Sequence, residues 1–249
     1  MNELNQLIQS FLQQYTFNNI DILLSHREIL KLDKDSLVDK LITRQRGGYC
    51  FENNQYFFNV LKDKGYDVHR YLGRVVYGGG NDVPRTHQMS VVNLGEEKFL
   101  VDVGFGPYTP GICVPFNGTL VSAFNGNQYR LVKLDDHNFQ LETLREKDFF
   151  SLYQFDQAIY VAADFKISNY YTNTHDDSKF TSSLTLSQLD KRGVKFISNL
   201  LFSTIYDGLR KDVSLKEMND FKRVIRDEFS VCYSDDELEK LHSIVQKLS

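Results

Sequence analysis

The segment THQMSVVNLGEEKFLVDVGFG, residues 86–106, is the stretch that says most about the fold of this chain. Two runs rich in branched and aromatic residues flank Gly95-Glu96. A two-residue loop with glycine first is typical of a type II′ turn, which joins the antiparallel strands of a β-hairpin. We therefore predict a hairpin in which Leu94 faces Glu97, so that the numbers of facing residues sum to 191.

A single aspartate interrupts the apolar second strand of this hairpin. Burying the carboxylate of Asp102 is costly unless it has a hydrogen-bond or charge partner. In the register above, His87 lies opposite Gly104 and becomes a diagonal neighbour of Asp102 on the same face. A three-residue loop would put the two side chains on opposite faces, and Asp102 could then cap a loop or pair with an arginine. The pattern favours a His87–Asp102 pair.

The hairpin lies between a helical first third and a mixed last part. Apolar residues at helical spacing predict an N-terminal helix along Leu4, Leu7, Ile8, Phe11 and Leu12. The other helices that we expect lie at 20–30, from residue 36, at 50–64 before Gly65, at 158–170, and after a capping box at residues 234–237. The other strands that we expect lie at 68–77, 128–134, 139–144, 180–187 and between 194 and 206.

The composition is that of a globular protein whose 249 residues allow one large domain or two or three packed subdomains. A net charge of −4 with mixed signs along the chain argues against nucleic-acid binding, which needs a basic face. Three widely spaced cysteines without a CxxC pair argue against a disulfide framework or a zinc site. Because we find neither a signal-peptide pattern nor a run long enough to cross a bilayer, we expect a cytoplasmic protein without a membrane partner.

The segment RQRGGYCFENNQYF, residues 44–57, places Cys50 where a helix begins. A thiol in the first helical turn lies near the positive end of the helix dipole, which favours the thiolate. Gly47 and Gly48 permit a sharp turn and would let a substrate carbonyl approach backbone N–H groups that could hold an oxyanion. The alternative is a packed cysteine without chemistry, since free cysteine is among the most buried residue types.

A catalytic thiol needs a base nearby and no uncompensated negative charge. Glu52, in the same turn as the thiol, opposes the thiolate, so we expect Arg44 or Arg46 to pair with it. Among the six histidines, only His87 has a second unusual residue as its expected neighbour. The five others lie in helix faces, strands or polar turns: His26, His69, His137, His175 and His242.

Cys50, His87 and Asp102 follow one another at separations of 37 and then 15 residues. They can supply the nucleophile, the base and the orienting carboxylate that thiol catalysis requires. A papain-like protease would have its histidine much further downstream, so that family fits poorly.

Three short blocks occur in a fixed order: RGGYCFE at residues 46–52 followed by Asn54, then Thr86-His87, then VDVGFG at residues 101–106. In this combination the sequence resembles the arylamine N-acetyltransferases. The resemblance is strong from about residue 40 to 110 and thin after about residue 190.

This resemblance implies an α+β fold of three parts. A helical bundle over residues 1–78 would carry the nucleophile, and a β-barrel-like domain over residues 79–185 would carry the histidine and the aspartate. An α/β lid would follow over residues 186–249. The core would hold a Cys-His-Asp triad like that of the cysteine proteases.

The same resemblance implies transfer of an acetyl group from acetyl-CoA to an arylamine, an arylhydrazine or an N-hydroxyarylamine. The reaction would be ping-pong through a thioester on Cys50, without a metal, with His87 as base and Asp102 orienting it. The other residues implied at the site are Thr86, Gly104 and Gly106 for coenzyme A, and Tyr49, Phe51 and Phe105 for the substrate.

Two other functions are compatible with the same residues. One is a thiol hydrolase or transglutaminase-like enzyme with the same order of triad residues, and the other is a binding protein on this scaffold that has lost catalysis. The identity of the amine, the range of acyl groups and the formation of a homodimer stay open at this stage.

Overall fold

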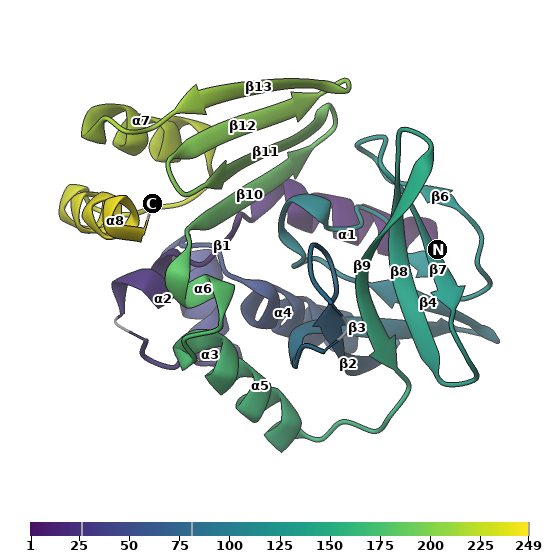
Figure 1. Ribbon diagram of the computed structural model, residues 1–249. Coiled ribbons are helices and arrows are strands. Elements are labelled where there is room, and N and C mark those ends of the chain that lie inside the picture. The colour runs from purple at the N-terminus through teal and green to yellow at the C-terminus, as the bar shows by residue number, and fades with distance from the viewer. Residues whose placement is uncertain (26, 81, 249) are drawn as a thin grey trace.

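The computed structural model describes residues 1–25, 27–80 and 82–248, which fold into helices and two antiparallel sheets (Figure 1). The chain begins with helices, continues through an eight-stranded sheet and ends with a smaller sheet and two helices. The expected α+β class is confirmed. His26 lies outside the described residues.

The N-terminal helices form where the apolar spacing predicts, with one exception. The helix expected over residues 20–30 ends at Leu24, and the following chain turns so that the N–H of Leu30 donates to Asn173 at 3.0 Å. After α3 the chain forms η1, a π-helical turn, which is wider than an α-helix and often lies at functional sites. The bounds are α1 Asn2–Gln14, α2 Ile20–Leu24, α3 Lys34–Val38, η1 Asp39–Thr43 and α4 Cys50–Asp63.

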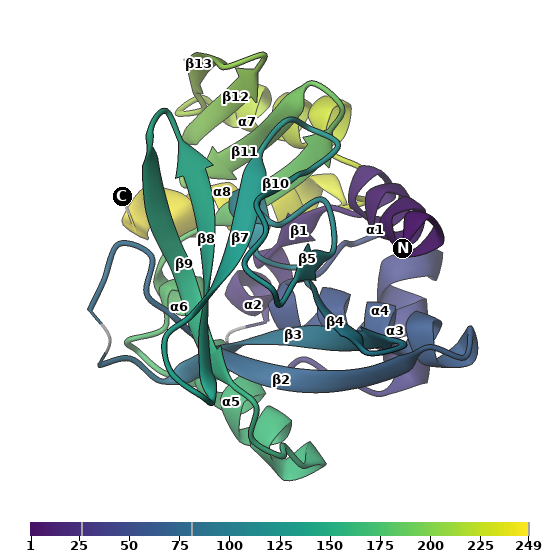
Figure 2. The ribbon, with the colours of Figure 1, turned by 90° about the vertical axis from the view of Figure 1, so that its right-hand side faces the viewer.

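The eight-stranded sheet curves into an incomplete barrel (Figure 2). Its strand order is β5-β4-β3-β2-β9-β8-β7-β6, and within the described residues the two end strands do not pair with each other. Met89, Leu100, Leu141 and Tyr153 belong to the apolar cluster that fills it. The bounds are β2 Asp67–Val75, β3 Arg85–Leu94, β4 Glu97–Val101, β5 Val114–Pro115, β6 Val121–Ser122, β7 Gln128–Lys133, β8 Asn138–Arg145 and β9 Asp148–Asp156.

The β3–β4 hairpin has the predicted register. Leu94 pairs with Glu97, and the ladder continues in step to Ser90 opposite Val101. Gly95 has a φ of 64° and Glu96 does not have a positive φ, the combination that a type II′ turn requires. The second strand ends at Val101 rather than at residue 105, because the backbone beyond it bonds to side chains instead of to β3.

The last part of the chain corrects one predicted strand. Residues 180–187 do not form a single strand, because Ser178 caps a short helix by accepting a hydrogen bond from the N–H of Phe180. The predicted box at the last helix is confirmed, since Ser234 and Glu237 bond each other's backbone N–H groups at 2.9 and 3.3 Å. The helical bounds are η2 Gly106–Tyr108, α5 Ala162–Thr174, α6 Lys179–Ser182, α7 Met218–Glu228 and α8 Asp235–Leu248.

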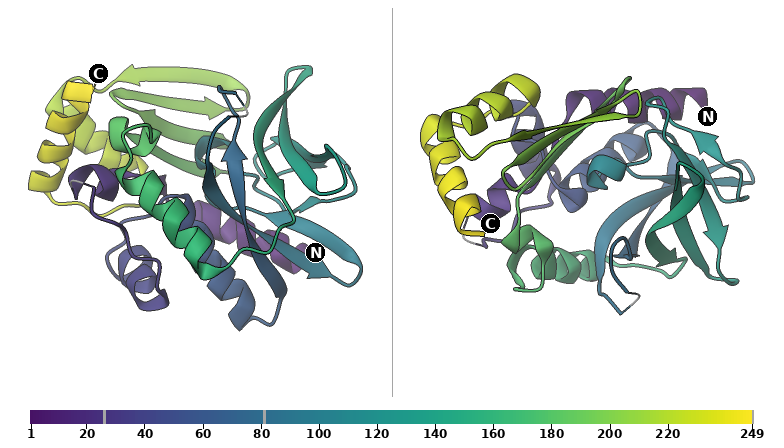
Figure 3. Two further views of the ribbon diagram at one scale, coloured as in Figure 1. Left: turned by 60° about the horizontal axis from the view of Figure 1, so that its bottom comes forward. Right: turned by 45° about the horizontal axis from the view of Figure 1, so that its top comes forward.

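The five-stranded sheet packs against the last two helices, which appear yellow beside it in Figure 3. Ile197 and Phe202 of the sheet share one apolar cluster with Phe221 of α7 and Leu241 of α8. The strand order is β1-β10-β11-β12-β13, with bounds β1 Phe17–Asn18, β10 Thr185–Asp190, β11 Gly193–Ser198, β12 Leu201–Tyr206 and β13 Leu209–Ser214.

Backbone pairing joins the three expected parts of the chain. β1, from the first part, pairs with β10, and β2 pairs with both β3 and β9 of the barrel. The division of the chain at residues 78/79 and 185/186 stays a prediction. With these bounds, the first part contributes β1 to the five-stranded sheet and β2 to the barrel.

Candidate active site

Cys50 is the first residue of α4, and Glu52 stabilises this helix end. Oε2 of Glu52 accepts a hydrogen bond from the backbone N–H of Tyr49 at 3.2 Å, which satisfies one of the free donors of a helix start. Cys50 is buried, and its Sγ lies 3.6 Å from the carbonyl oxygen of Thr86. The thiol therefore donates a weak hydrogen bond to the strand that carries His87.

His87 and Asp102 form the pair that the hairpin predicts. Nε2 of His87 lies 2.7 Å from Oδ2 of Asp102, and both side chains are buried. Asp102 lies just past the end of β4, and its Oδ1 accepts the N–H of Gly104 at 2.8 Å. The hydroxyl of Tyr153 donates to Oδ2 at 2.9 Å, and its ring centroid lies 4.8 Å from that of His87. The imidazole is thus held from two sides.

Asn54 connects the helix of the thiol to the loop of the carboxylate. Its Nδ2 donates to Oδ1 of Asp102 at 2.9 Å and to the carbonyl of Gln88 at 2.7 Å. Its Oδ1 accepts the N–H of Val103 at 2.9 Å. Because Asn54 lies one turn after Cys50 on α4, these bonds fix the thiol relative to the His87–Asp102 pair.

The pKa values of the two acidic groups of the site, the Asp102 carboxyl and the Cys50 thiol, respond differently to burial. Burial alone would raise the pKa of Asp102, but His87 and the Asn54 donor hold this pKa below its usual value, so the carboxyl is ionised. Burial raises the pKa of the Cys50 thiol, and the charges of Asp102 and Glu52 add to this effect, while backbone hydrogen bonds oppose it. The thiolate expected at a helix start is therefore disfavoured. The thiol needs a base close by to take its proton.

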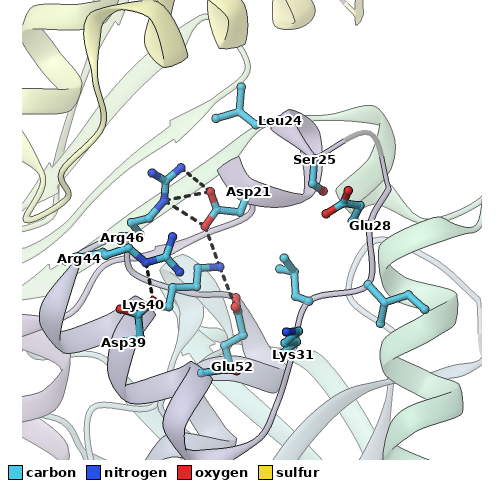
Figure 4. A pocket seen from close by; sticks show the side chains of 13 residues that line it. Asp21, Leu24, Ser25, Glu28, Lys31, Asp39, Lys40, Arg44, Arg46 and Glu52 are labelled. Carbon is cyan, nitrogen blue, oxygen red and sulfur yellow. Dashed lines mark hydrogen bonds and ion pairs between the residues drawn. The ribbon is translucent and has the colours of Figure 1, made fainter.

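The predicted partner of Glu52 is wrong. Nζ of Lys40 lies 2.6 Å from Oε1 of Glu52, whereas Arg46 pairs with Asp21 and Arg44 pairs with Asp39 (Figure 4). The side chain of Lys40 comes from η1, which turns it toward the buried carboxylate. Negative charge beside the thiol is thus balanced, but by a lysine.

A cavity of about 590 Å³ reaches both Cys50 and His87. Its walls come from β3, the loop after β4, the end of α5, and α6. Four other predicted site residues line it: Thr86, Gly104, Phe105 and Gly106. The ring centroid of Phe105 lies 4.9 Å from that of His87, at an interplanar angle of 76°. The cavity therefore presents a thiol, an imidazole and an aromatic wall.

Tyr49 and Phe51 have no exposed surface and do not line this cavity. They pack in an apolar cluster, and the hydroxyl of Tyr49 bonds to Asn173 of α5. Both rings lie in the core, so the structure does not bring them to the cavity of Cys50 and His87, and their contact with substrate stays a prediction.

The two glycines before Tyr49 serve close packing rather than the cavity. Gly47 has a φ of 64°, and a Cβ there would lie 2.4 Å from the carbonyl oxygen of Thr16. At Gly48, a Cβ would lie 2.9 Å from Cβ of Glu52. Neither glycine lines the cavity that reaches Cys50, and the approach of a substrate carbonyl to them stays a prediction.

Comparison with known proteins identifies the family of this chain. A family model described as N-acetyltransferase matches residues 1–237. The arylamine N-acetyltransferase of Escherichia coli (strain K12) is 34% identical over 194 residues, which cover 77% of this chain and 68% of that protein. The chain belongs to the arylamine N-acetyltransferase family.

Solved structures of this family have the same fold. The arylamine N-acetyltransferase of Mycobacterium marinum has a TM-score of 0.91 at 26% identity, covering 100% of this chain and 93% of that one. Its complex with CoA has a TM-score of 0.91 at 25% identity, with the same coverage.

In this arylamine N-acetyltransferase family member, sequence reasoning missed Tyr153 and Lys40. Tyr153 lies in β9, which was not predicted, although the aromatic residues in 148–156 were a signal for a strand. Lys40 is flanked by the buried Leu37 and Leu41, and a lysine beside an apolar helical stripe was the only available sign of its burial.

Across residues 1–25, 27–80 and 82–248, no helix combines the length and apolarity that crossing a bilayer requires. In the same part of the chain, no three His, Cys, Asp or Glu side chains gather into a group that could hold a metal ion.

Proposed function

We propose that this family member transfers an acetyl group from acetyl-CoA to an arylamine, an arylhydrazine or an N-hydroxyarylamine. The observation that carries the proposal is one cavity that reaches Cys50 and His87, with Asp102 bonded to the same imidazole. Membership of the arylamine N-acetyltransferase family supports the reaction, and the CoA complex of the Mycobacterium marinum relative supports the donor. A cytoplasmic location and a homodimer stay predictions.

In the first step, Sγ of Cys50 bonds to the carbonyl carbon of the acetyl thioester. Because Nε2 of His87 binds Asp102, Nδ1 is the ring nitrogen left to take the thiol proton. Burial disfavours a lone thiolate, so proton transfer accompanies the attack. Backbone N–H groups near Cys50 hold the oxyanion. The bond to the coenzyme A sulfur then breaks, and His87 returns the proton to that sulfur.

In the second step, the acceptor attacks the acetyl group on Cys50. The acceptor gives its proton to His87, the bond between the carbonyl carbon and Sγ breaks, and the thiol regains the proton. Asp102 fixes the imidazole tautomer and stabilises the imidazolium in both steps. The first step exchanges one thioester for another, whereas the second forms an amide from a thioester when the acceptor is an amine, and is therefore downhill.

The walls of the cavity suit these substrates. Phe105 stands beside His87 and offers a face for a flat aromatic acceptor. Thr86, Gly104 and Gly106 leave room at the other walls for the thioester arm of coenzyme A. Exclusion of water by the buried surroundings of Cys50 protects the acetyl-enzyme from hydrolysis.

The proposal is tested by mass spectrometry of the protein after incubation with acetyl-CoA alone. We expect one acetyl group on the peptide that contains Cys50, and its loss with formation of acetylated amine after an aniline or arylhydrazine is added. Cys50→Ser should abolish transfer without unfolding the protein, whereas Cys232→Ser, at an exposed thiol, should keep full activity. Absence of acetyl on Cys50 refutes the proposal, and rapid release of coenzyme A without an amine supports a hydrolase instead.

A further inference from the structure

A buried ion pair lies at a second cavity of about 490 Å³ (Figure 4), and its carboxylate belongs to Glu52, two residues after Cys50. This cavity shares no lining residue with the one that reaches Cys50. Lys40 and Glu52 meet here at 2.6 Å, and their side chains are only 8% and 1% exposed. A lysine is almost never this buried without a partner, so the pair is a specific feature of the site.

The pair has more neighbours than a simple ion pair. Nζ of Lys40 also lies 3.0 Å from Oδ2 of Asp21. Arg46 does not reach Glu52, because its Nη2 is engaged at 2.7 Å by both Asp21 and Glu237, and its guanidinium lies over the ring of Tyr233. The other charged residues around this cavity are Glu28, Lys31, Asp39 and Arg44. Lys40 is therefore the cation that directly compensates Glu52.

Net stability is a weak reason for such a pair. Taking two charges out of water costs about as much as their attraction returns, and well-packed apolar residues often do as well. Lys40 also lies on η1, a π-helical turn, and such turns often occur at functional sites. Both points indicate a role linked to the nucleophile.

The connection from Glu52 to the thiol is short. Oε1 of Glu52 binds Lys40, while Oε2 accepts the N–H of Tyr49, the residue immediately before Cys50. Glu52 has opposing effects: its hydrogen bond orders the first turn of α4, and its charge disfavours a thiolate.

We propose that Lys40 is a positioning residue for the nucleophile. It holds the carboxylate of Glu52 against the N–H of Tyr49, and it cancels the charge that Glu52 would otherwise direct at Cys50. The inference rests on the proposed function only in taking Cys50 as the nucleophile.

The test is the pH profile of Cys50 alkylation by iodoacetamide, followed on the Cys50 peptide of the full-length protein. Glu52→Gln keeps an oxygen acceptor and removes the charge, so the midpoint should fall by about half to one pH unit. Alkylation well below the midpoint should then be about 3- to 10-fold faster, because its rate follows the thiolate fraction. Burial raises the pKa of Glu52 even with Lys40 beside it, so in Lys40→Met the carboxyl opposes the thiolate only above this raised pKa. In that pH range the uncompensated charge should raise the midpoint by a similar amount.

A double variant and a conservative variant extend the test. Lys40→Met combined with Glu52→Gln removes both charges and should bring the midpoint back toward that of the unmodified protein. Lys40→Arg keeps the cation and should shift the midpoint less than Lys40→Met. The alkylation profile of the exposed Cys232 should not change in any variant.

The sign of the two single shifts decides the proposal, because a merely structural pair would slow or disorder Cys50 in both variants alike. Shifts in the same direction, or no downward shift in Glu52→Gln, overturn it. If circular dichroism shows that Lys40→Met does not fold, Glu52→Gln decides alone. Alkylation needs no acetyl-CoA, so failure of this inference appears as unchanged midpoints, and failure of the proposed function appears as an unacetylated but reactive Cys50.

Discussion

Asp102→Asn is the substitution for which the structure makes the sharpest prediction. Oδ1 of Asp102 accepts hydrogen bonds from Asn54 and Gly104, and Oδ2 accepts from His87 and Tyr153. Whichever way the new amide turns, its NH₂ group faces two donors. One orientation gives His87 a donor in place of an acceptor, which moves the ring proton to Nδ1, the nitrogen that must accept the proton of the thiol.

The size of both effects follows from these contacts. Leaving two buried donors without an acceptor costs about 1–3 kcal/mol each, so the free energy of unfolding should fall by about 2–6 kcal/mol. A wrong tautomer on the base should lower kcat by on the order of 10³- to 10⁴-fold, as when a carboxylate that orients a catalytic histidine becomes an amide.

The loss of stability should also depend on pH. His87 and the other partners hold the pKa of Asp102 below its usual value in the folded protein, although burial acts against this. The contribution of the carboxylate is therefore complete above the pKa of the unfolded chain and disappears as the pH falls through the lower folded pKa. The difference between Asp102→Asn and the unmodified protein should be largest near neutral pH and should shrink on acidification.

Steady-state acetyl transfer and guanidinium unfolding, both at several pH values, measure these quantities. The matched control is Asp212→Asn on β13, where the half-exposed carboxylate bonds to Ser203 and Arg210. It should change the free energy of unfolding far less than Asp102→Asn does and leave acetyl transfer unchanged. A folded Asp102→Asn enzyme with kcat within about tenfold of the unmodified value would refute the reasoning.

Two other substitutions test the surroundings of the site. Tyr153→Phe removes one donor from Asp102 and should lower the free energy of unfolding by about 1–2 kcal/mol and kcat/KM by up to roughly tenfold; unchanged stability and activity would show that the hydroxyl does not support the carboxylate. Gly104→Ala would put a Cβ 3.0 Å from Cα of Cys50, so it should cost about 1–3 kcal/mol and slow acetyl transfer. Gly80→Ala, where a Cβ meets nothing within 4 Å, is its control in both assays, and equal behaviour of the two variants would contradict the packing argument.

Local signals predicted those parts of the fold whose cause lies within a few residues. The register of β3 and β4 follows from Gly95-Glu96, because a two-residue loop leaves only one way for the strands to pair. The start of α4 at Cys50 and its end before Gly65, which has a φ of 84°, follow from the apolar pattern and the turn residues. The wrong strand at residues 180–187 has the same kind of cause, since a Ser178 cap overrode the alternation.

By itself, then, the sequence determined the hairpin, the helix of the thiol and the order of Cys50, His87 and Asp102. Tertiary structure alone decided which partners these residues have. Lys40 rather than an arginine reaches Glu52 because η1 is rotated toward α4, and Tyr153 reaches Asp102 because β9 lies beside β2 in the curved sheet. Burial likewise raises the pKa of the Cys50 thiol, although a helix start by itself favours the thiolate. These outcomes depend on how distant elements pack, and no local pattern carries that information.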